Sequence, residues 1–431
     1  MAIAQRETPL RTKIFPKTIK PPPEKRGTTK HLARRPSPSL PRFPRRCIIC
    51  VVRQPSLEGV QLLRSIRFLL LAAVALLAAV AGGGRDAAAF TNGAPNSIAV
   101  LGDSISQGTN FDVAHFGSNP TYSWATGTQA AVQSVYTRIL AGNPNISGKN
   151  FNYSVNGAKM TDANGQAVNL NGTPGGIELA MLELGGNDIC TSTEAAMTPV
   201  ATYRTQFQTA MNTLTTGFPN RRIFILSVPD VYQLWAVLHD NENARNAWAG
   251  FNICQSLLLN PTSTAQADVD RRARVRQRNI DFNTQLSEVC ALYPQCHFDN
   301  NAIFNAGFTA ADVSNLDYFH PSLQGQTNLA AGAWQVFDMD GDGWATASET
   351  TIGTDPLDNC PDNTSDNAWP ADINNDGFSD ISDVSALTSV FGNAVPPAPA
   401  RYNIAPDPPD GFVDITDVSR MVGFFGLACS P

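Results

Sequence analysis

The sequence has little charge, few histidines and no long apolar run, and these shortages exclude several classes of protein. Only 16% of the 431 residues are charged, whereas 42% are hydrophobic, which is close to the globular norm and excludes wholesale disorder. The apolar run over residues 68–81 has fourteen residues, fewer than the about 20 that a membrane span needs. The residues after Arg67 hold 15 bases and 34 acids. This excess of negative charge after Arg67 repels phosphate backbones, and we expect no nucleic-acid partner.

The N-terminal residues read as targeting sequence rather than as a folded domain. Residues 1–66 are rich in Pro, Lys and Arg and have no apolar periodicity, so we expect a disordered leader or a start codon assigned too early. A positive flank, a short apolar stretch and small residues beyond it then predict a signal peptide over residues 67–89. Cleavage could follow Ala81 or Ala89, and an uncleaved anchor is the alternative. We therefore expect a secreted or cell-surface protein.

Export changes the interpretation of the cysteines. Cys47 and Cys50 form a C-x-x-C pair, but no second ligand pair follows, so a zinc site is not expected. Six cysteines remain, and an even number in an oxidising compartment indicates three disulfides. Proximity in the sequence favours the pair Cys290–Cys296. This leaves Cys190–Cys254 and Cys360–Cys429 as the other two pairs.

Residues 90–337 alternate between strand-like and helix-like segments. Strands are expected at 97–101, 151–155, 177–184, 222–228 and 297–299, and helices at 128–140, 202–218, 265–292 and 324–337. Such alternation predicts an α/β fold with three layers, in which a parallel sheet is covered by helices on both faces. Active sites in these sheets lie beyond the carboxyl ends of the strands.

A serine and a histidine stand where such a site would need them. Ser104 follows Gly102 and Asp103 at the carboxyl end of the first strand, which suits a nucleophile, although an N-cap serine is the structural alternative. The α/β-hydrolase elbow Gly-x-Ser-x-Gly is absent, because Ser106 stands where its second glycine belongs. His320 follows Asp317 by three residues, so the carboxylate can orient the imidazole and leave Nε2 for the serine.

Two further strand ends could supply an oxyanion hole. Asn187 follows the strand at 177–184, and its side chain can donate an N–H to a tetrahedral oxyanion without adding charge. Gly157 follows the strand at 151–155, where its backbone N–H can approach the same point. Each feature alone fits an ordinary strand-ending turn, but four in this order on one alternating sheet form a strong pattern.

Across residues 97–337 the chain resembles the SGNH, or GDSL-type, hydrolases. The four blocks of that family match Gly102-Asp103-Ser104, Gly157, Gly185-x-Asn187-Asp188 and Asp317-x-x-His320, with Ile105 in place of the leucine of GDSL. The resemblance implies Ser104 as nucleophile, His320 as general base and acid, and Asp317 as its orienter. It also implies an oxyanion hole of the Ser104 and Gly157 amides and the Asn187 side chain.

Residues 338–431 form a second, acidic module, with sixteen acids and two bases. Residues 338–349 fit a twelve-residue calcium loop, with Asp338, Asp340 and Asp342 at positions one, three and five and Glu349 at twelve. Trp344 stands at position seven. We expect a small helical module that holds structural calcium, and no cofactor for catalysis. The stretch that follows, through Cys360, also resembles a thrombospondin type 3 repeat.

A repeat with an offset of 34 residues follows the first loop. Its first copy carries the candidate ligands Asp372, Asn374, Asp376, Phe378 and Asp383, and its second copy carries Asp410 and Asp417. Proline occupies positions one and three of the second copy, so that site is degenerate or rerouted through Asn403 and Asp407. The paired loops resemble a dockerin domain, which implies docking to a cohesin-like or cell-surface partner. A tail that is only stapled by calcium is the alternative.

Together these features predict an exported serine ester hydrolase, an esterase or lipase that forms an acyl-enzyme from a lipid or acylated carbohydrate ester. One rival is a carbohydrate acetyl esterase tethered to a polysaccharide-degrading assembly. Another is a non-catalytic, calcium-dependent adhesion protein. The segment 232–249 is read as a loop near the pocket, and its Trp and Leu side chains indicate either an apolar binding surface or core packing.

Overall fold

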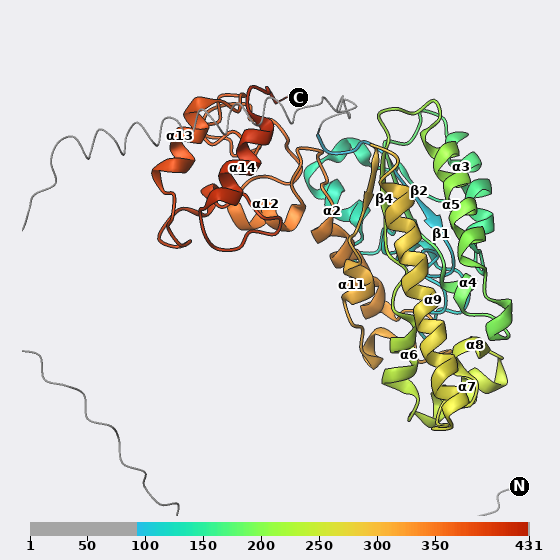
Figure 1. Cartoon of the computed structure of the whole chain (residues 1–431). Coiled ribbons are helices and arrows are strands. Elements are labelled where there is room, and N and C mark those ends of the chain that lie inside the picture. The colour runs from blue at the N-terminus through green and yellow to red at the C-terminus, as the bar shows by residue number, and fades with distance from the viewer. Residues whose placement is uncertain (1–92, 430–431) are drawn as a thin grey trace, which may run out of the picture. The chain divides into compact units, whose positions relative to one another are not determined.

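A five-stranded parallel sheet with helices on both faces forms the larger part of the structure, a computed structural model that describes residues 93–429 (Figure 1). The strand order is β2-β1-β3-β4-β5, and every neighbouring pair is parallel. The predicted three-layer α/β fold is therefore confirmed. The expected leader at 1–66, the signal peptide at 67–89 and the C-x-x-C pair of Cys47 and Cys50 lie outside the described residues.

The strands are β1 (Ile98–Gly102), β2 (Asn150–Asn152), β3 (Leu179–Glu183), β4 (Arg222–Ile225) and β5 (Cys296–Phe298). The helices between and around them are α2 (Val135–Gly142), α3 (Ala163–Asn171), α4 (Gly186–Ile189), α5 (Val200–Thr215), α6 (Val231–Leu238), α7 (Glu242–Gly250), α8 (Gln255–Leu258), α9 (Gln266–Cys290), α10 (Ala302–Asn305) and α11 (Leu323–Val336). The C-terminal residues carry α12 (Thr346–Ile352), α13 (Ile381–Ser389) and α14 (Ile415–Phe424).

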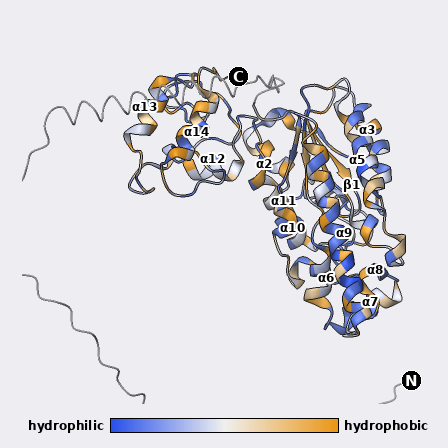
Figure 2. Cartoon of the chain, in the orientation of Figure 1, coloured by the Kyte–Doolittle hydropathy of each residue, from blue (hydrophilic) through white to orange (hydrophobic). Residues whose placement is uncertain are grey.

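One face of the sheet packs against α3, α5 and α9. Leu101 and Leu182 point from the strands into this layer and are fully buried. Tyr203 of α5 stacks on Phe282 of α9, with 3.9 Å between ring centroids. Apolar burial on both faces explains why the strands are continuous apolar runs rather than alternating ones. In Figure 2 much of the exposed helix α7 is blue, whereas β1 is orange.

The other face packs against α2, α10 and α11. Val100 and Met181 alternate with the residues of the first layer and are fully buried here, together with Ile139 of α2. Phe337, just after α11, stacks on Phe224 of β4, with 4.3 Å between centroids. The end of α11 is thus fixed to the centre of the sheet.

Three segments differ from the sequence prediction. The helix expected at 128–140 begins only at Val135, because the Ser134 side chain caps it by accepting from the Thr137 amide. The segment 232–249 is not a loop: it forms α6 and α7, whose Trp248 is 1% exposed and packs in the core. The helix α3 was not expected, since its apolar residues are mostly alanine and give a weak periodic signal.

The C-terminal residues build a separate small core around Trp344, Trp369 and Leu387. The first calcium-loop segment also reaches the large core, since Met339 is fully buried among the residues under β4. Arg222 of β4 donates to the Met339 carbonyl at 2.6 Å and to the Gly93 carbonyl at 2.8 Å. These contacts join the start of the loop to the sheet.

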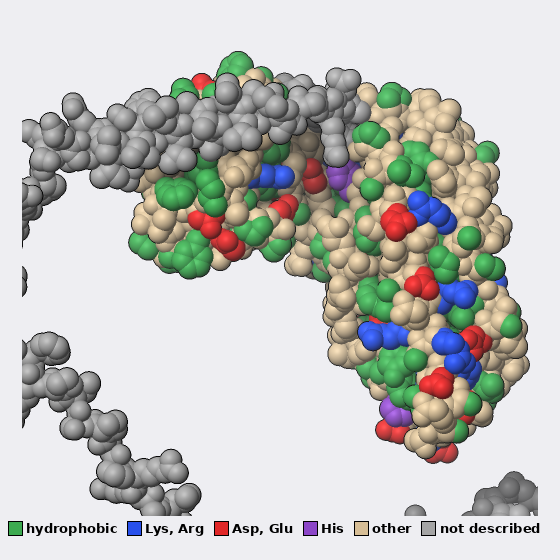
Figure 3. All heavy atoms as spheres, viewed as in Figure 1, with side chains coloured by type: hydrophobic (Ala, Val, Ile, Leu, Met, Phe, Trp, Pro, Cys, Tyr) green, Lys and Arg blue, Asp and Glu red, His purple; other side chains and the backbone are tan. Residues whose placement is uncertain are grey.

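The surface carries charges of both signs. Figure 3 shows Asp and Glu side chains beside Lys and Arg side chains on the face that carries α9, where Arg274 pairs with Glu194 at 2.6 Å. Between residues 93 and 429, no helix is both long and apolar enough to cross a membrane.

Three disulfides connect the six cysteines of the described chain, in the pairing that proximity favoured. They are Cys190–Cys254, Cys290–Cys296 and Cys360–Cys429. We expect protein that is denatured without reductant to show no free thiol at these six positions, because an oxidising compartment keeps such bonds closed. Peptide mapping by mass spectrometry checks both the thiols and the pairing. Free thiols at both Cys290 and Cys296 would contradict the pairing and the compartment together.

Candidate active site

The nucleophile candidate lies on a tight turn at the carboxyl end of β1. Ser104 is 6% exposed, and the neighbouring Asp103 carboxylate accepts the Ile105 amide at 2.9 Å, which fixes the turn. Glycine is required just before it: a Cβ on Gly102 would lie 2.8 Å from the Glu183 carbonyl oxygen. The close approach of β1 and β3 thus sets where the serine begins its turn.

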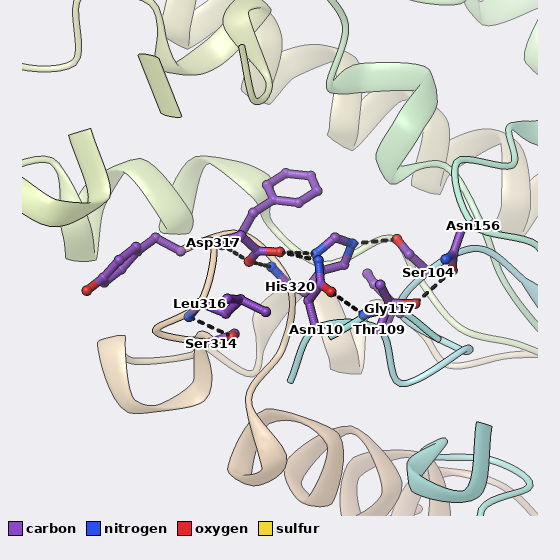
Figure 4. A network of polar contacts seen from close by, with 12 residues as sticks. Ser104, Thr109, Asn110, Gly117, Asn156, Ser314, Leu316, Asp317 and His320 are labelled. Carbon is purple, nitrogen blue, oxygen red and sulfur yellow. Dashed lines mark hydrogen bonds and ion pairs between the residues drawn. The ribbon is translucent and has the colours of Figure 1, made fainter. Parts of the chain in front are cut away.

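Three side chains form a chain of hydrogen bonds at this strand end (Figure 4). His320 Nε2 lies 2.8 Å from Ser104 Oγ, and His320 Nδ1 lies 2.7 Å from Asp317 Oδ2. The other oxygen of Asp317 accepts the Phe319 and His320 amides, so the carboxylate is held by its own loop. Burial alone would raise the pKa of Asp317, but the hydrogen bond and the charge of His320 lower it below its ordinary value. The carboxylate therefore stays ionised beside the imidazole.

Two residues that sequence reasoning missed support this loop. Asn110 donates to Asp317 Oδ2 at 2.9 Å and accepts the Gly117 amide, as Figure 4 shows. Trp248 of α7 donates its indole N–H to the Tyr318 carbonyl at 2.8 Å. Neither residue has a local sequence signal, because Asn110 lies 207 residues before Asp317 and Trp248 lies 70 before Tyr318.

The predicted oxyanion donors lie beside the nucleophile turn. Asn187 Nδ2 donates to Asp103 Oδ2 at 3.0 Å and to the Ala158 carbonyl at 3.1 Å, so it lies between the neighbours of Ser104 and Gly157. The buried Asp188 accepts the Met160 amide at 2.8 Å and thereby ties the two loops together. Gly157 has φ +76° with open space where a Cβ would be, which suits a bare amide facing substrate.

Comparison with known families agrees with this geometry. The family model described as GDSL-like Lipase/Acylhydrolase matches residues 98–333, more than half of the chain. The chain belongs to this family. It is accordingly a carboxylic ester hydrolase of the esterase and lipase type.

Among solved structures, the fold is similar to that of an acetyl xylan esterase from Geobacillus stearothermophilus, with 15% identity over 58% of this chain and 98% of that one and a TM-score of 0.35. It is also similar to a phospholipase A1 from Streptomyces albidoflavus, with 16% identity over 56% and 99% and a TM-score of 0.32. These scores carry no argument about the substrate. A search of curated proteins found no match.

In this GDSL-like site, two carboxyl groups, Asp103 and Glu183, are buried near the predicted oxyanion donors. Burial raises the pKa of Asp103 to about 6, against the opposing effects of the Ile105 amide and the His320 charge. Burial, and then repulsion from Asp103, raises the pKa of Glu183 well above its ordinary value. Neither Glu183 oxygen has a hydrogen-bond partner among the described residues, so burial here disfavours the charged form of this carboxyl.

Two cavities meet at His320. The first, of about 180 Å³, runs under the imidazole between β4, α6, α10 and α11, and Ile105 and Gly186 lie at its end near the nucleophile. The second, of about 440 Å³, lies on the other side, against Asn110, Asn187 and Asp317. A substrate at Ser104 thus has room on both sides of its ester bond.

The candidate metal ligands fall into three loops that differ in geometry. The carboxylates of Asp338, Asp340 and Asp342 lie within 4.8 Å of one another, the one acidic group of this size within residues 93–429. In the second loop Asp372 accepts the Gly377 amide, as Asp338 accepts the Gly343 amide in the first, and Asp383 accepts the Ile373 and Asp380 amides.

The third loop is the least ligand-like of the three. Asp417 accepts the Ala405 and Asp414 amides, and Asp410 is exposed. Asp407 accepts the Ala345 amide at the start of α12, so its carboxylate serves the first loop rather than the third. A site rerouted through Asp407 is therefore disfavoured, and Asp410 and Asp417 remain predictions.

The Asp103–Asn187 hydrogen bond generates a test. In Asp103→Asn a single side-chain oxygen remains to accept both the Ile105 amide and Asn187 Nδ2. The Asn187 amide therefore loses its fixed orientation. We expect kcat to fall by about 10- to 100-fold, less than the about 10²–10³-fold typical for loss of an oxyanion donor itself. Asn187→Ala, which removes the donor, should lose more. Wild-type kcat in Asp103→Asn would show that Asp103 does not orient Asn187.

Although Asp103→Asn should lower kcat, it should raise stability relative to wild type at high pH. Because folding raises the Asp103 pKa from 3.8 to about 6, ionisation of this group costs the wild type stability as pH rises through that window. Asp103→Asn cannot ionise. Its melting temperature relative to wild type should therefore be higher near pH 8 than near pH 4, as scanning calorimetry at both pH values can measure. If the difference in melting temperature between the two proteins is the same at both pH values, the raised pKa of Asp103 is contradicted.

Proposed function

We propose that this chain is an exported serine ester hydrolase that works through an acyl-enzyme, with Ser104 as nucleophile, His320 as general base and acid, and Asp317 as its orienter. The observation that carries the proposal is the relay of two contacts, 2.8 Å from Ser104 Oγ to His320 Nε2 and 2.7 Å from His320 Nδ1 to Asp317. These distances lie within the reach that proton transfer needs.

The geometry supports a two-step reaction. Ser104 Oγ attacks the ester carbonyl carbon while His320 Nε2 takes its proton, and Asp317 stabilises the imidazolium that forms. The tetrahedral oxygen receives the backbone N–H groups of Ser104 and Gly157 and one N–H of Asn187, which leaves its present acceptor, Asp103 or the Ala158 carbonyl, when the oxyanion forms. His320 then protonates the departing alcohol, and the acyl group stays on Ser104. A water molecule, deprotonated by His320, attacks the acyl-enzyme and releases the acid and the free serine.

The adhesion-protein rival fits the site less well. A binding module does not need a buried serine within hydrogen-bond distance of an imidazole, nor a carboxylate held by two backbone amides and Asn110. Export is supported by the three disulfides, because structural disulfides persist in oxidising compartments.

We further propose that the first calcium loop holds a structural Ca²⁺. Asp340 is fully buried and Asp342 nearly so, and one oxygen of each, with both oxygens of Glu349, has no hydrogen-bond partner. Burial, and then repulsion from Asp342 and the other aspartates, raises the pKa of Glu349 to about 12. Buried oxygens without donors that face one another fit a hard cation with oxygen ligands. The Trp344 carbonyl would supply the ligand at position seven.

This ion would be linked to the sheet rather than only to the tail. Asp340 accepts the Gly93 amide through its carbonyl at 2.9 Å, and Arg222 of β4 holds both the Gly93 and Met339 carbonyls. The site lies apart from the triad, so the ion has no place in the ester chemistry.

The repeats of the tail present the same apolar positions twice, which supports a docking role. Each copy leaves matching side chains half exposed or more: Phe378 and Phe412, both 55%, Ile381 and Ile415, 64% and 56%, and Phe391 and Phe425, 50% and 51%. Matching exposure in both copies is expected of a binding face, whereas a tail that only stabilises has no use for it. We propose a cohesin-like or cell-surface partner for this face.

Ser104→Ala tests the nucleophile. It removes one oxygen from a turn that backbone hydrogen bonds hold, so the fold should remain, whereas loss of a triad member typically costs several orders of magnitude in kcat. The measurement is hydrolysis of a p-nitrophenyl ester beside a melting curve. Ser147→Ala, which removes an exposed hydroxyl away from the site, is the matched control and should keep its turnover. Retention of more than about a tenth of wild-type turnover in Ser104→Ala would remove Ser104 from this role.

Calcium removal tests the metal proposal. Calcium at a hundredfold its dissociation constant should stabilise the folded protein by about 3 kcal/mol. We therefore expect a chelator to lower the melting temperature of the full chain, and Glu349→Gln to lose most of this calcium dependence. Glu242→Gln, on α7, is the control and should keep it. Ester hydrolysis at moderate temperature should persist in chelator. Loss of turnover while circular dichroism still shows folded protein would place calcium in the active site.

A further inference from the structure

We propose that the cavity under His320 binds the acyl chain and that the enzyme prefers esters of medium-length fatty acids, of about six to eight carbons, over acetyl esters. The proposal rests on the proposed function of Ser104 and His320 and specifies its substrate. It separates the lipid-type substrate from the acetylated carbohydrate that the sequence left open.

The cavity walls are mostly apolar. The apolar side chains come from α6, α10, α11 and the loops beside them: Val228, Val231, Leu234, Ile303, Val313 and Leu329. Besides His320, two polar side chains lie in the wall, and Asn328 donates to Asp312 at 2.7 Å. Asp312 also accepts the Thr309 amide and hydroxyl. Hydrocarbon therefore enters without stripping water from an unpaired polar group.

The size of the cavity sets the chain length. Its volume of about 180 Å³ is slightly larger than the about 150 Å³ of an apolar protein cavity that takes benzene, a six-carbon ligand. An acetyl group would leave most of this space empty. Each further methylene buried there should raise affinity for the transition state by about fourfold, until the cavity is full.

The opposite cavity suits the alcohol part of the ester. It holds Phe116 and Phe251, which are 83% and 72% exposed, together with the polar Asn110 and Asn187. The Cys190–Cys254 disulfide fixes one of its walls. A wall of mixed polarity with exposed side chains can accept alcohols of different size, whereas the smaller, mostly apolar cavity selects the acid.

The experiment is a series of p-nitrophenyl esters, from acetate through butyrate, hexanoate and octanoate to dodecanoate. We expect kcat/KM to rise at least about tenfold from acetate to hexanoate or octanoate and to fall for dodecanoate. Ala306→Trp should lower kcat/KM for hexanoate and octanoate to that of acetate in the same variant or below it, because Ala306 is an exposed residue of the cavity lining, where a large side chain takes up space without replacing a core side chain. Leu329→Trp, from α11, is the second filling variant. Ala310→Trp, exposed but outside the cavity, is the control and should keep the wild-type profile.

Labelling of Ser104 by an organophosphonate separates the two levels of the proposal. Labelled Ser104 with acetate as the best substrate would overturn the chain-length inference and leave the hydrolase standing. A rising profile that Ala306→Trp and Leu329→Trp both leave unchanged would also overturn it, since the chain would then bind elsewhere. Failure of both labelling and ester hydrolysis would overturn the proposed function itself.

Discussion

The contact between Ser104 and His320 depends on placing two side chains that are 216 residues apart in the sequence at 2.8 Å from each other. The sheet supplies most of this precision. β1 and β3 pair in register so that Gly102 lies opposite Glu183, and both strands then turn into the site within two residues. Asn187 donates to Asp103, and Asp188 accepts the Met160 amide, so the two turns and the Gly157 loop form one hydrogen-bonded unit. The histidine loop joins this unit from α11, held by Asn110 and Trp248.

The parts of this arrangement that follow local rules could be predicted from the sequence. Ser104, Asn187 and Gly157 each follow an apolar strand, and parallel strands end at one edge of a sheet, so their convergence is expected. The positions of Asn110 and Trp248 could not be predicted, because their partners lie far along the chain and their residue types are common in any surface or core. The interpretation of 232–249 as a loop was wrong for a related reason. Leu234, Leu238 and Trp248 are buried in the core, and α6 packs against α8 and α9, which are partners that no local pattern shows.

The calcium loop shows how a local motif takes its setting from tertiary structure. Its spacing specifies which oxygens face one another, but not that Met339 is buried among the side chains under β4 or that Arg222 binds the loop carbonyls. Burial of that kind raises the energetic cost of leaving the carboxylates without a cation, because a buried charge needs a partner. The same burial links a metal proposal made from a twelve-residue pattern to the stability of the catalytic sheet. Carboxylates accept backbone amides in all three loops, so the first loop is distinguished by its contact with the sheet through Arg222.

The two cavities govern which ester is bound, whereas the hydrogen-bonded unit at the strand ends holds the groups proposed for catalysis. His320 lines both cavities, which fits the proposed reaction, in which the imidazole takes a proton from Ser104 and delivers it to the departing alcohol. The walls beyond His320 come from α6, α10 and α11 on one side and from the loops around Phe116 and Phe251 on the other. Ile105 of the first cavity and Asn187 of the second belong to the hydrogen-bonded unit around Asp103, whereas the apolar side chains of α6, α10 and α11 do not. Changes in those apolar side chains can therefore alter the ester that is bound without altering the groups proposed to break it, because an activity resides in the site rather than in the fold as a whole.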